Sequence, residues 1–453
     1  MATATDEKDH ERAAAADPDC GLVYIGWARW LTGRGRRQEA LKVLGAAQSR
    51  RERIAPIERA EVAVMAATLS GDHAARLQGL AELAALTPSD AQPARTLGQL
   101  EFGAWRFEAA LTWYRRAIAI EPDNSDLRNM MAYAQAYGGD LDAARASATD
   151  YSRLVPDDPN APDSLGEIEF LDGNFAAAEK LFLTAHEMNA AWRESGPLLK
   201  AAHARVMTGD VAGADGLVGR YLELRKSVND PLIPYRQAQW EFVTGRRRQA
   251  MERLQSFRAA ASGDVAAHAA AQLAAWKRQT GDLTGARQMA IEALKQGTTP
   301  PTRSLAALVT FVTEPPASAS EWAVRAEQAF SQPADNTIRR YALAYALLFE
   351  GHFREASVLL KQMLRQTLPS LAGDLRTLTA WALIESGQTE DARAIGNLYP
   401  IPEAQGERTF SALAMPRVLQ VRARLLEQQG QKDQAARLRA VYEKLKGDIP
   451  DAR

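Results

Sequence analysis

Small residues and prolines recur every 34 residues over much of the first half of this chain. Three sets of residues keep this spacing: Gly98, Ala132 and Gly166; Ala110, Ala144 and Ala178; Pro88, Pro122 and Pro156. Because three independent markers share one period, the segment 97–124 is one copy of an internal repeat. A repeat of this length restricts the chain to stacked copies of a small unit, each supported by its neighbours.

A glycine followed five residues later by an alanine marks further copies. These pairs are Gly35/Ala40, Gly139/Ala144, Gly173/Ala178, Gly209/Ala214, Gly245/Ala250, Gly281/Ala286, Gly351/Ala356, Gly387/Ala392 and Gly430/Ala435. In the copy at 97–124, Trp105 takes the place of the glycine. The repeat therefore extends over nearly the whole chain of 453 residues.

Each unit has the pattern of an apolar-periodic helix, a short turn and a second apolar-periodic helix. Glycine suits the turn because it adopts positive φ without steric cost. The small residue of the first helix and the alanine of the second allow the two helices to approach closely, and a large residue such as Tyr114 or Phe182 fills the space beside them. The sequence predicts an all-α protein, a helical-repeat solenoid of about twelve antiparallel helix pairs.

The repeat resembles the tetratricopeptide repeat (TPR) family. The residues that carry this resemblance are Leu97, Gly98, Ala110, Tyr114, Ala117 and Pro122 in one copy, and Leu165, Gly166, Ala178, Phe182 and Ala185 in another. The resemblance implies a right-handed superhelix with a concave groove lined by the first helix of each unit. The array also resembles, more loosely, the repeat-rich C-terminal half of bacterial multidomain regulators, which implies an effector domain upstream.

Breaks in the repeat predict the domain organisation. Two proline-rich stretches, GTTPPTR and TEPPASAS, interrupt one degenerate copy in which Trp322 occupies the alanine position. We expect a hinge there, because proline ends helices. The predicted parts are a polar N-terminal segment (1–20), an N-terminal TPR block (21–298), the degenerate repeat and hinge (299–335), a C-terminal TPR block (336–447) and a tail (448–453).

Composition excludes several classes of protein. The net charge is -1, which gives no bulk attraction to nucleic acid or to an anionic membrane. Cys20 is the single cysteine, so neither an intrachain disulfide nor a cysteine-based zinc site can form. The sequence contains no run of about 18 apolar residues, so it predicts no membrane span. The acidic N-terminus lacks the basic and apolar regions of a signal peptide, which predicts a cytoplasmic protein or a sequence whose natural N-terminal part has been removed.

The sequence shows no pattern typical of catalysis. Its six histidines are not at metal-ligand spacing, and neither a phosphate-binding loop nor a nucleophile elbow is present. We therefore expect no enzyme activity, no metal and no cofactor. Two arginine clusters, Arg34/Arg36/Arg37 and Arg246/Arg247/Arg248, fall in hairpin turns. A solvated edge explains them most simply, and a phosphate-binding edge that contacts nucleic acid is the alternative.

The TPR resemblance implies which residues face the groove. They are Arg95, Gln99, Phe102, Asn129, Tyr133, Tyr137, Asn160, Asp163, Glu167, Lys200, His203, Tyr235, Gln239 and Phe242. This mixture of polar and aromatic side chains suits an extended peptide. The family's clamp for a chaperone C-terminus is disfavoured, because its basic pair in the third unit is replaced by Asn160 and Ser164.

The predicted function follows from this groove. We expect a non-enzymatic scaffold that holds a protein or peptide segment, as the interaction or sensor part of a bacterial regulatory or assembly system. A nucleic-acid-binding solenoid and an adaptor of an envelope complex are the alternatives.

Overall fold

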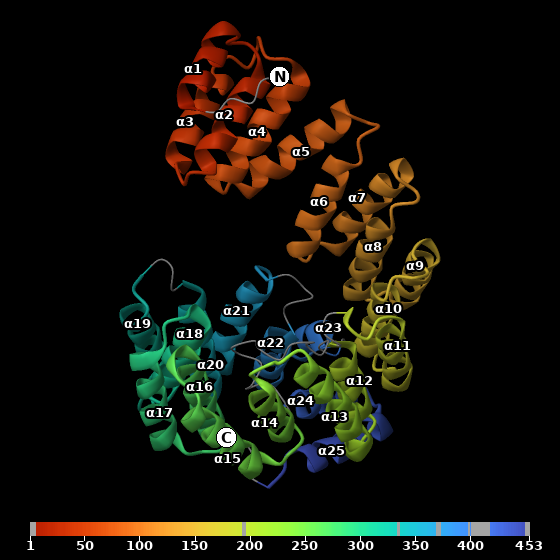
Figure 1. The fold of residues 1–453 in the computed structure, drawn as a ribbon, viewed down its shortest axis with the longest axis vertical. Helices are drawn as coiled ribbons and strands as arrows, with labels where there is room; N and C mark the ends of the chain where they lie inside the picture. The colour runs from red at the N-terminus through yellow and green to blue at the C-terminus, as the bar shows by residue number, and fades with distance from the viewer. Residues whose placement is uncertain are drawn as a thin grey trace. The chain divides into compact units, whose positions relative to one another are not determined.

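The computed structural model in Figure 1 describes residues 6–192, 196–332, 336–367, 373–396, 399 and 417–448. All regular structure in these residues is helical, with 25 helices. The chain divides into two compact units, Met1–Leu154 and Val155–Arg453. The prediction of an all-α helical-repeat array is confirmed.

The first unit contains nine helices in its described residues. They are α1 (Glu7–Ala16), α2 (Gly21–Thr32), α3 (Arg37–Gln48), α4 (Pro56–Ser70), α5 (His73–Leu86), α6 (Gln92–Gly103), α7 (Phe107–Ile120), α8 (Ser125–Gly138) and α9 (Leu141–Leu154). From α2 onward they form four helix pairs whose members pack on each other and on the neighbouring pair.

The second unit continues the same pattern over its described residues. Its helices are α10 (Asn160–Asp172), α11 (Phe175–Met188), α12 (Gly196–Met207), α13 (Val211–Ser227), α14 (Ile233–Val243), α15 (Arg247–Ala260), α16 (Gly263–Gln279), α17 (Leu283–Gln296), α18 (Pro300–Val312), α19 (Ala319–Ala329), α20 (Asn336–Phe349), α21 (Phe353–Leu364), α22 (Gly373–Glu385), α23 (Thr389–Gly396), α24 (Arg417–Gln428) and α25 (Lys432–Leu445). Together the two units hold the twelve predicted pairs, α2/α3 to α24/α25.

The N-terminal segment that was predicted as polar contains a helix. The Asp6 side chain caps α1 by accepting a hydrogen bond from the Asp9 backbone N–H at 2.9 Å. The helix contacts α2, where the rings of His10 and Trp30 lie 5.7 Å apart between centroids. Arg36 joins the same corner through hydrogen bonds to Glu7 at 2.7 and 3.0 Å.

The repeat markers have the physical roles expected of them. The turn glycines take positive φ, for example 95° at Gly139 and 90° at Gly245. Trp105, which replaces the glycine in one copy, is held at φ 61°. The left-handed conformation costs a non-glycine residue roughly 1–2 kcal/mol. The turn is therefore kept at Trp105 in spite of this cost.

Glycines inside the first helices allow the two helices of a pair to approach. A Cβ atom added at Gly98 would lie 2.5 Å from Cε1 of Tyr114, and one at Gly166 would lie 2.8 Å from Cε1 of Phe182. Both aromatic side chains are fully buried. Each ring thus occupies the space that any larger residue in the first helix would need.

The segment 299–335, expected to be a hinge, contains a helix pair within the second unit. Trp322 of α19 is buried, and its ring lies 5.1 Å from that of Phe311 in α18. Helix α18 also packs on α16, α17 and α20. The two compact units meet after Leu154, and a hinge at 299–335 stays a prediction.

The second unit returns on itself. Figure 1 shows α24 and α25 beside α12 and α13, and α25 contacts α12 directly. One apolar core contains residues of α10 to α14 together with residues of α24 and α25. The last helix pair of the chain therefore packs on the first pairs of this unit.

Candidate functional site

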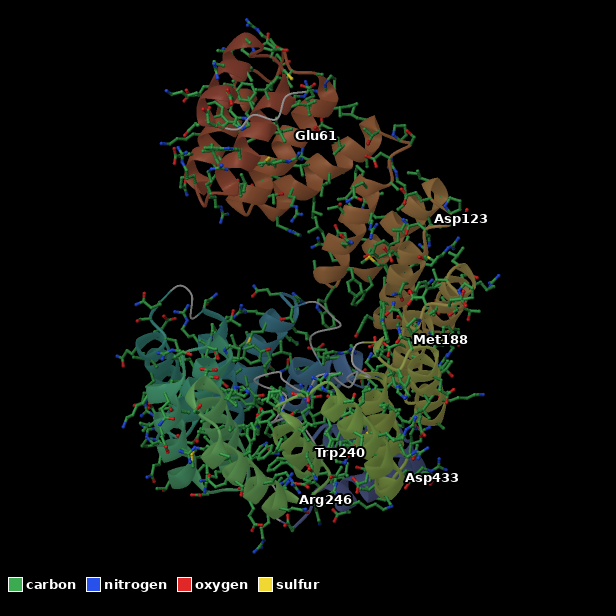
Figure 2. All side chains as sticks on the ribbon, viewed as in Figure 1. Glu61, Asp123, Met188, Trp240, Arg246 and Asp433 are labelled. Atoms are coloured by element: carbon green, nitrogen blue, oxygen red, sulfur yellow. The ribbon has the colours of Figure 1, made fainter. Side chains whose placement is uncertain are left out.

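The predicted groove residues lie on the first helices of five successive pairs, α6, α8, α10, α12 and α14. The structure separates them into two groups by burial. The buried group is Phe102, Tyr137, Asp163, Lys200, Tyr235 and Phe242. The group that keeps exposed surface is Arg95, Gln99, Asn129, Tyr133, Asn160, Glu167, His203 and Gln239. Figure 2 shows the side chains on the ribbon, including Trp240 of α14.

In the first unit, polar side chains join α6 to α8. The Arg95 guanidinium donates to Oδ2 of Asp126 at 3.3 Å, and Gln99 Nε2 lies 3.5 Å from the Met130 sulfur. Both contacts involve exposed groups, so they add little stability by themselves. These contacts nevertheless orient the side chains of Arg95 and Gln99 toward α8.

Phe102 and Tyr137 belong to an aromatic cluster rather than to an open surface. The Phe102 ring centroid lies 6.0 Å from that of Tyr137 and 5.9 Å from that of Phe107, both edge to face. Only 8% of each of Phe102 and Tyr137 is exposed. In the second unit Phe242 is likewise enclosed, stacked on Trp276 at 4.3 Å. These rings support the first helices and leave little surface for a ligand.

Lys200 links α12 to α10 through a buried ion-pair cluster. Its ammonium donates to Oδ2 of Asp163 at 2.6 Å and also to Glu167. Burial alone would lower the pKa of Lys200, but the Glu167 and Asp163 carboxylates outweigh it and raise the pKa above its ordinary value. Lys200 therefore stays charged, with two carboxylates for one cation.

His203, one turn further along α12, is neutral at physiological pH. Burial lowers its pKa to about 4. Its ring meets the edge of Trp240 at a centroid distance of 5.3 Å. The Trp240 indole N–H in turn donates to Oδ1 of Asp215 at 2.6 Å. A neutral imidazole with some exposed surface can hydrogen-bond to a ligand without carrying charge.

Three first helices are joined by a hydrogen-bond network that includes residues outside the predicted set. Tyr235 Oη lies 3.2 Å from His268 Nε2 and donates to Oε1 of Gln272 at 3.2 Å. His268 Nδ1 lies 3.2 Å from Oγ1 of Thr302. The network spans α14, α16 and α18. The sequence did hold a signal, because His268 follows Tyr235 by 33 residues and Thr302 follows His268 by 34, close to the repeat period.

Asp264 anchors the far end of this network. It accepts hydrogen bonds from the backbone N–H groups of Thr298 and Thr299 at 2.6 and 2.8 Å, and from the Thr302 hydroxyl at 3.0 Å. Burial would raise the pKa of Asp264, but these bonds and that from the Thr299 hydroxyl hold it well below its usual range. The carboxylate thus fixes the connection between α17 and α18.

Three arginines of the two arginine-rich turns are paired or buried, while Arg34, Arg37 and Arg248 are exposed. The Arg246 guanidinium makes two hydrogen bonds to Asp215, at 2.8 and 2.9 Å. Arg247 is fully buried, with its guanidinium carbon 5.0 Å from the Phe242 ring centroid. A solvated edge is therefore wrong for Arg247. In the first unit Arg36 pairs with Glu7 and Glu39. Such pairing reduces the positive charge that a phosphate backbone would need.

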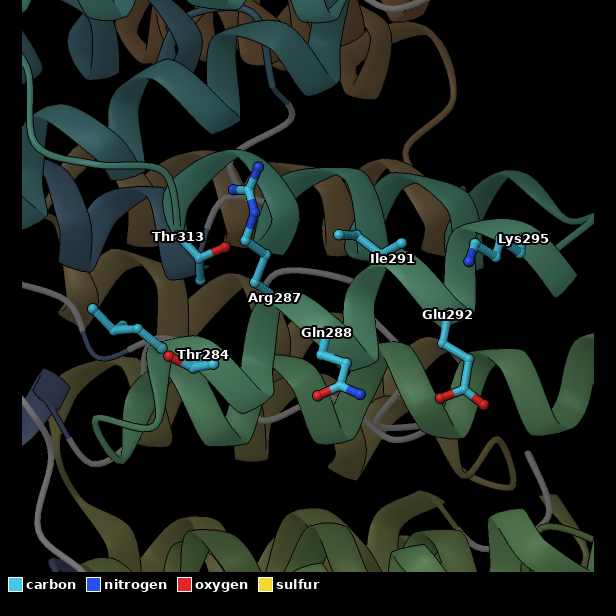
Figure 3. A pocket seen from close by; sticks show the side chains of 8 residues that line it. Thr284, Arg287, Gln288, Ile291, Glu292, Lys295 and Thr313 are labelled. Atoms are coloured by element: carbon cyan, nitrogen blue, oxygen red, sulfur yellow. The ribbon is translucent and has the colours of Figure 1, made fainter.

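An open pocket of about 580 Å³ runs along α17, on the second helix of its pair. Figure 3 shows its lining residues, which are Leu283, Thr284, Arg287, Gln288, Ile291, Glu292, Lys295 and Thr313. Arg287 donates to the Thr310 carbonyl at 3.0 Å and Glu292 pairs with Arg258. Two of its charged groups are therefore engaged within the protein.

Among the described residues, no three or more His, Cys, Asp or Glu side chains lie together in a way that could hold a metal ion. Among the same residues, no helix is long and apolar enough to cross a membrane.

Comparison with protein-family models finds no match, and comparison with curated protein sequences finds none. Several solved structures are similar. They include YrrB, described as a TPR protein with an unusual peptide-binding site (14% identity, 41% of this chain and 95% of that chain, TM-score 0.35). A TPR protein from Parabacteroides merdae aligns at 16% identity over 56% of this chain and 98% of its own, with a TM-score of 0.38. A structure of Naa15/Naa10 bound to HypK-THB aligns at 13% identity over 96% of this chain and 72% of its own, with a TM-score of 0.34.

The twelve helix pairs, their glycine turns and their small-residue contacts define the class of this protein, which is a TPR-like helical-repeat array. At the identities and TM-scores above, this assignment rests on the features of the chain itself.

Proposed function

We propose that this chain is a non-enzymatic scaffold that binds a protein or peptide segment along the first helices of its repeats. The observation that carries the proposal is a row of side chains held in place on α10, α12 and α14. Lys200 of α12 binds Asp163 and Glu167 of α10, and Tyr235 of α14 is held by His268 and Gln272. Such a row of fixed side chains repeats with the spacing of the pairs. An extended segment lying across the helices can be read by side-chain amides and aromatic faces at regular intervals.

The supporting groups are held by contacts within the protein. Lys200 and Tyr235 are buried and hold their neighbours through hydrogen bonds. Beside them, Glu167, His203 and Gln239 keep exposed surface. Side chains that are fixed before binding lose less conformational entropy when a partner arrives. We therefore place the recognition surface on α10, α12 and α14 of the second unit.

The biological setting is part of the same proposal. The loose resemblance to the repeat-rich halves of bacterial regulators suggests an interaction or sensor role in a regulatory or assembly system. A cytoplasmic location and an upstream effector domain fit this role. The paired arginines at the turns argue against the nucleic-acid alternative.

The test is selection of peptides on the intact chain from a random library, followed by fluorescence anisotropy of the enriched peptides. The double variant His203→Ala with Gln239→Ala should weaken binding by roughly tenfold or more, the loss expected for central contacts. Gln288→Ala, at an exposed position of α17, is the matched control and should bind as the wild type does. Equal binding by the wild type, the double variant and the control would show that the site lies on other residues. A library without enriched peptides would contradict peptide binding.

A further inference from the structure

The C-terminal helix pair presents an apolar stripe to the start of the second unit. On α25 the stripe consists of Ala435, Leu438, Val441 and Leu445, all buried. They share one core with Leu198, Ala202 and Met207 of α12 and with residues of α13. Because their spacing is three, three and four residues, they lie on one face of the helix. An amphipathic helix thus already docks on this surface from within the same chain.

Polar contacts follow the edge where the helices of each pair turn. The Tyr399 N–H donates to the Leu171 carbonyl at 3.0 Å, and Lys444 Nζ donates to the Gly209 carbonyl at 3.0 Å. The Asp448 N–H donates to the Gly245 carbonyl at 3.1 Å. The turns at Gly173, Gly209 and Gly245 are 36 residues apart. C-terminal residues therefore contact three successive turns on one edge.

Asp448 adds a second contact at the third turn. Its carboxylate accepts hydrogen bonds from the Arg247 N–H at 2.9 Å and the Arg248 N–H at 3.2 Å, at the start of α15. These N–H groups have no partner within their own helix, and the helix dipole favours a negative charge there. The C-terminal end of the docked hairpin is thereby recognised by charge as well as by shape.

The turn glycines of this edge are shaped for the docked segment. A Cβ at Gly173 would lie 2.9 Å from the Tyr399 ring, and one at Gly245 would lie 2.8 Å from Cα of Gly447. By contrast, a Cβ at Gly35 or Gly139 would meet nothing within 4 Å. The glycines at 173 and 245 therefore serve close approach of a second segment in addition to the turn itself.

We propose that the turn edge of α10–α15, together with α12, is a docking surface for an amphipathic helix followed by Gly-Asp, and that the C-terminal hairpin occupies it as a reversible latch. Lys444 and Asp448, which make the edge contacts, are exposed, so water can compete for them. On α12 this surface uses Leu198, Ala202 and Met207, whereas the row proposed above to bind peptide uses Lys200 and His203. A partner helix with the same pattern would compete with the latch.

The test measures binding of a fluorescent peptide, residues 432–448, to the intact chain by anisotropy. In the wild type the latch competes with the peptide, which raises the apparent Kd. The variant Leu438→Asp weakens the latch and leaves the docking surface unchanged. Because apparent affinity scales with the fraction of open chain, its apparent Kd should fall by roughly tenfold or more. A control peptide with Asp at both 438 and 441 should bind neither chain.

Hydrogen exchange supplies a second readout on the same samples. Amides of the turn around Gly209 should exchange faster in Leu438→Asp and slow again when the peptide is added, while α16 and α17 stay protected. If the variant loses protection in α16 and α17 as well, Val441→Ala replaces it. Equal apparent Kd for the wild type and a protected variant would overturn the latch, as would binding of the control peptide. A concentration-dependent dimer of the wild type would show that a second copy fills the surface instead.

Discussion

Replacing Gly98 with alanine should destabilise the first unit, although alanine is the better helix former. The new Cβ would lie 2.5, 2.6 and 3.0 Å from three ring carbons of Tyr114. Ordinary carbon contacts are about 3.5–4.0 Å, so the enclosed ring must move by roughly 1 Å. Such overpacking costs about 1–3 kcal/mol, which offsets or exceeds the gain of about 1 kcal/mol in helix propensity.

The matched control is Gly26→Ala in α2, because a Cβ there meets nothing within 4 Å. We expect Gly26→Ala to stabilise its helix by about 1 kcal/mol, so the two substitutions should differ by roughly 1–3 kcal/mol. Native-state hydrogen exchange of the two helix pairs measures these local opening free energies without assuming two-state unfolding of a repeat array.

A double-mutant cycle tests the cause. In a Tyr114→Ala background the ring is gone, so Gly98→Ala should become stabilising. If Gly98→Ala remains destabilising by the same amount without the ring, the contact with Tyr114 is not the reason for the glycine.

Three further predictions concern the second unit. Lys200→Met leaves Asp163 and Glu167 without their cation and should cost about 3–5 kcal/mol. Protection of α10 and α12 from exchange should fall at pH 7, and unchanged protection would contradict the ion-pair cluster. Asp264 has a depressed pKa, so its contribution to stability is present above about pH 4, its unfolded value, and is lost as pH falls through the folded pKa. The protection factors of the Thr298 and Thr299 amides, measured relative to intrinsic exchange at each pH, should fall at low pH in the wild type. An Asp264→Asn chain should show low protection factors at every pH. Trp322→Ala should cost roughly 3–5 kcal/mol, seen as faster exchange across α18 and α19, and a neutral result would mean that this pair is not packed through its aromatic residues.

The repeat period predicted the helix pairs because the interactions that define them are local. Gly98 and Tyr114 are 16 residues apart, within one unit, so their packing constraint leaves a direct trace in the sequence. The same period could have led from Tyr235 to His268 and Thr302, whose side chains meet one repeat apart. Chemical type alone does not tell a packing residue from a binding residue, since aromatic residues on a first helix serve packing as readily as binding.

Return of the chain on itself left no such trace. Lys444 meets Gly209 across 235 residues, and Asp448 meets Arg247 across 201. No period connects these positions, and the repeat pattern of α24/α25 resembles that of any other pair. The turn glycines do not predict this contact either, because Gly173 and Gly245 have the same sequence pattern as the glycines of solvent-facing turns. Burial of Arg247 follows from its neighbours in space and could not be read from three consecutive arginines.

The contact of α25 with α12 also limits how this protein can change in length. An open array can gain or lose a helix pair at low cost, because each pair needs only its neighbours. In the second unit, α24/α25 must arrive at α12 after a set rise and rotation, so an added or missing pair anywhere between them would carry the last helix past its partner. Repeat number is thus fixed by geometry from α10 to α25. Gene duplications that insert a whole repeat should be tolerated in the first unit and removed by selection in the second.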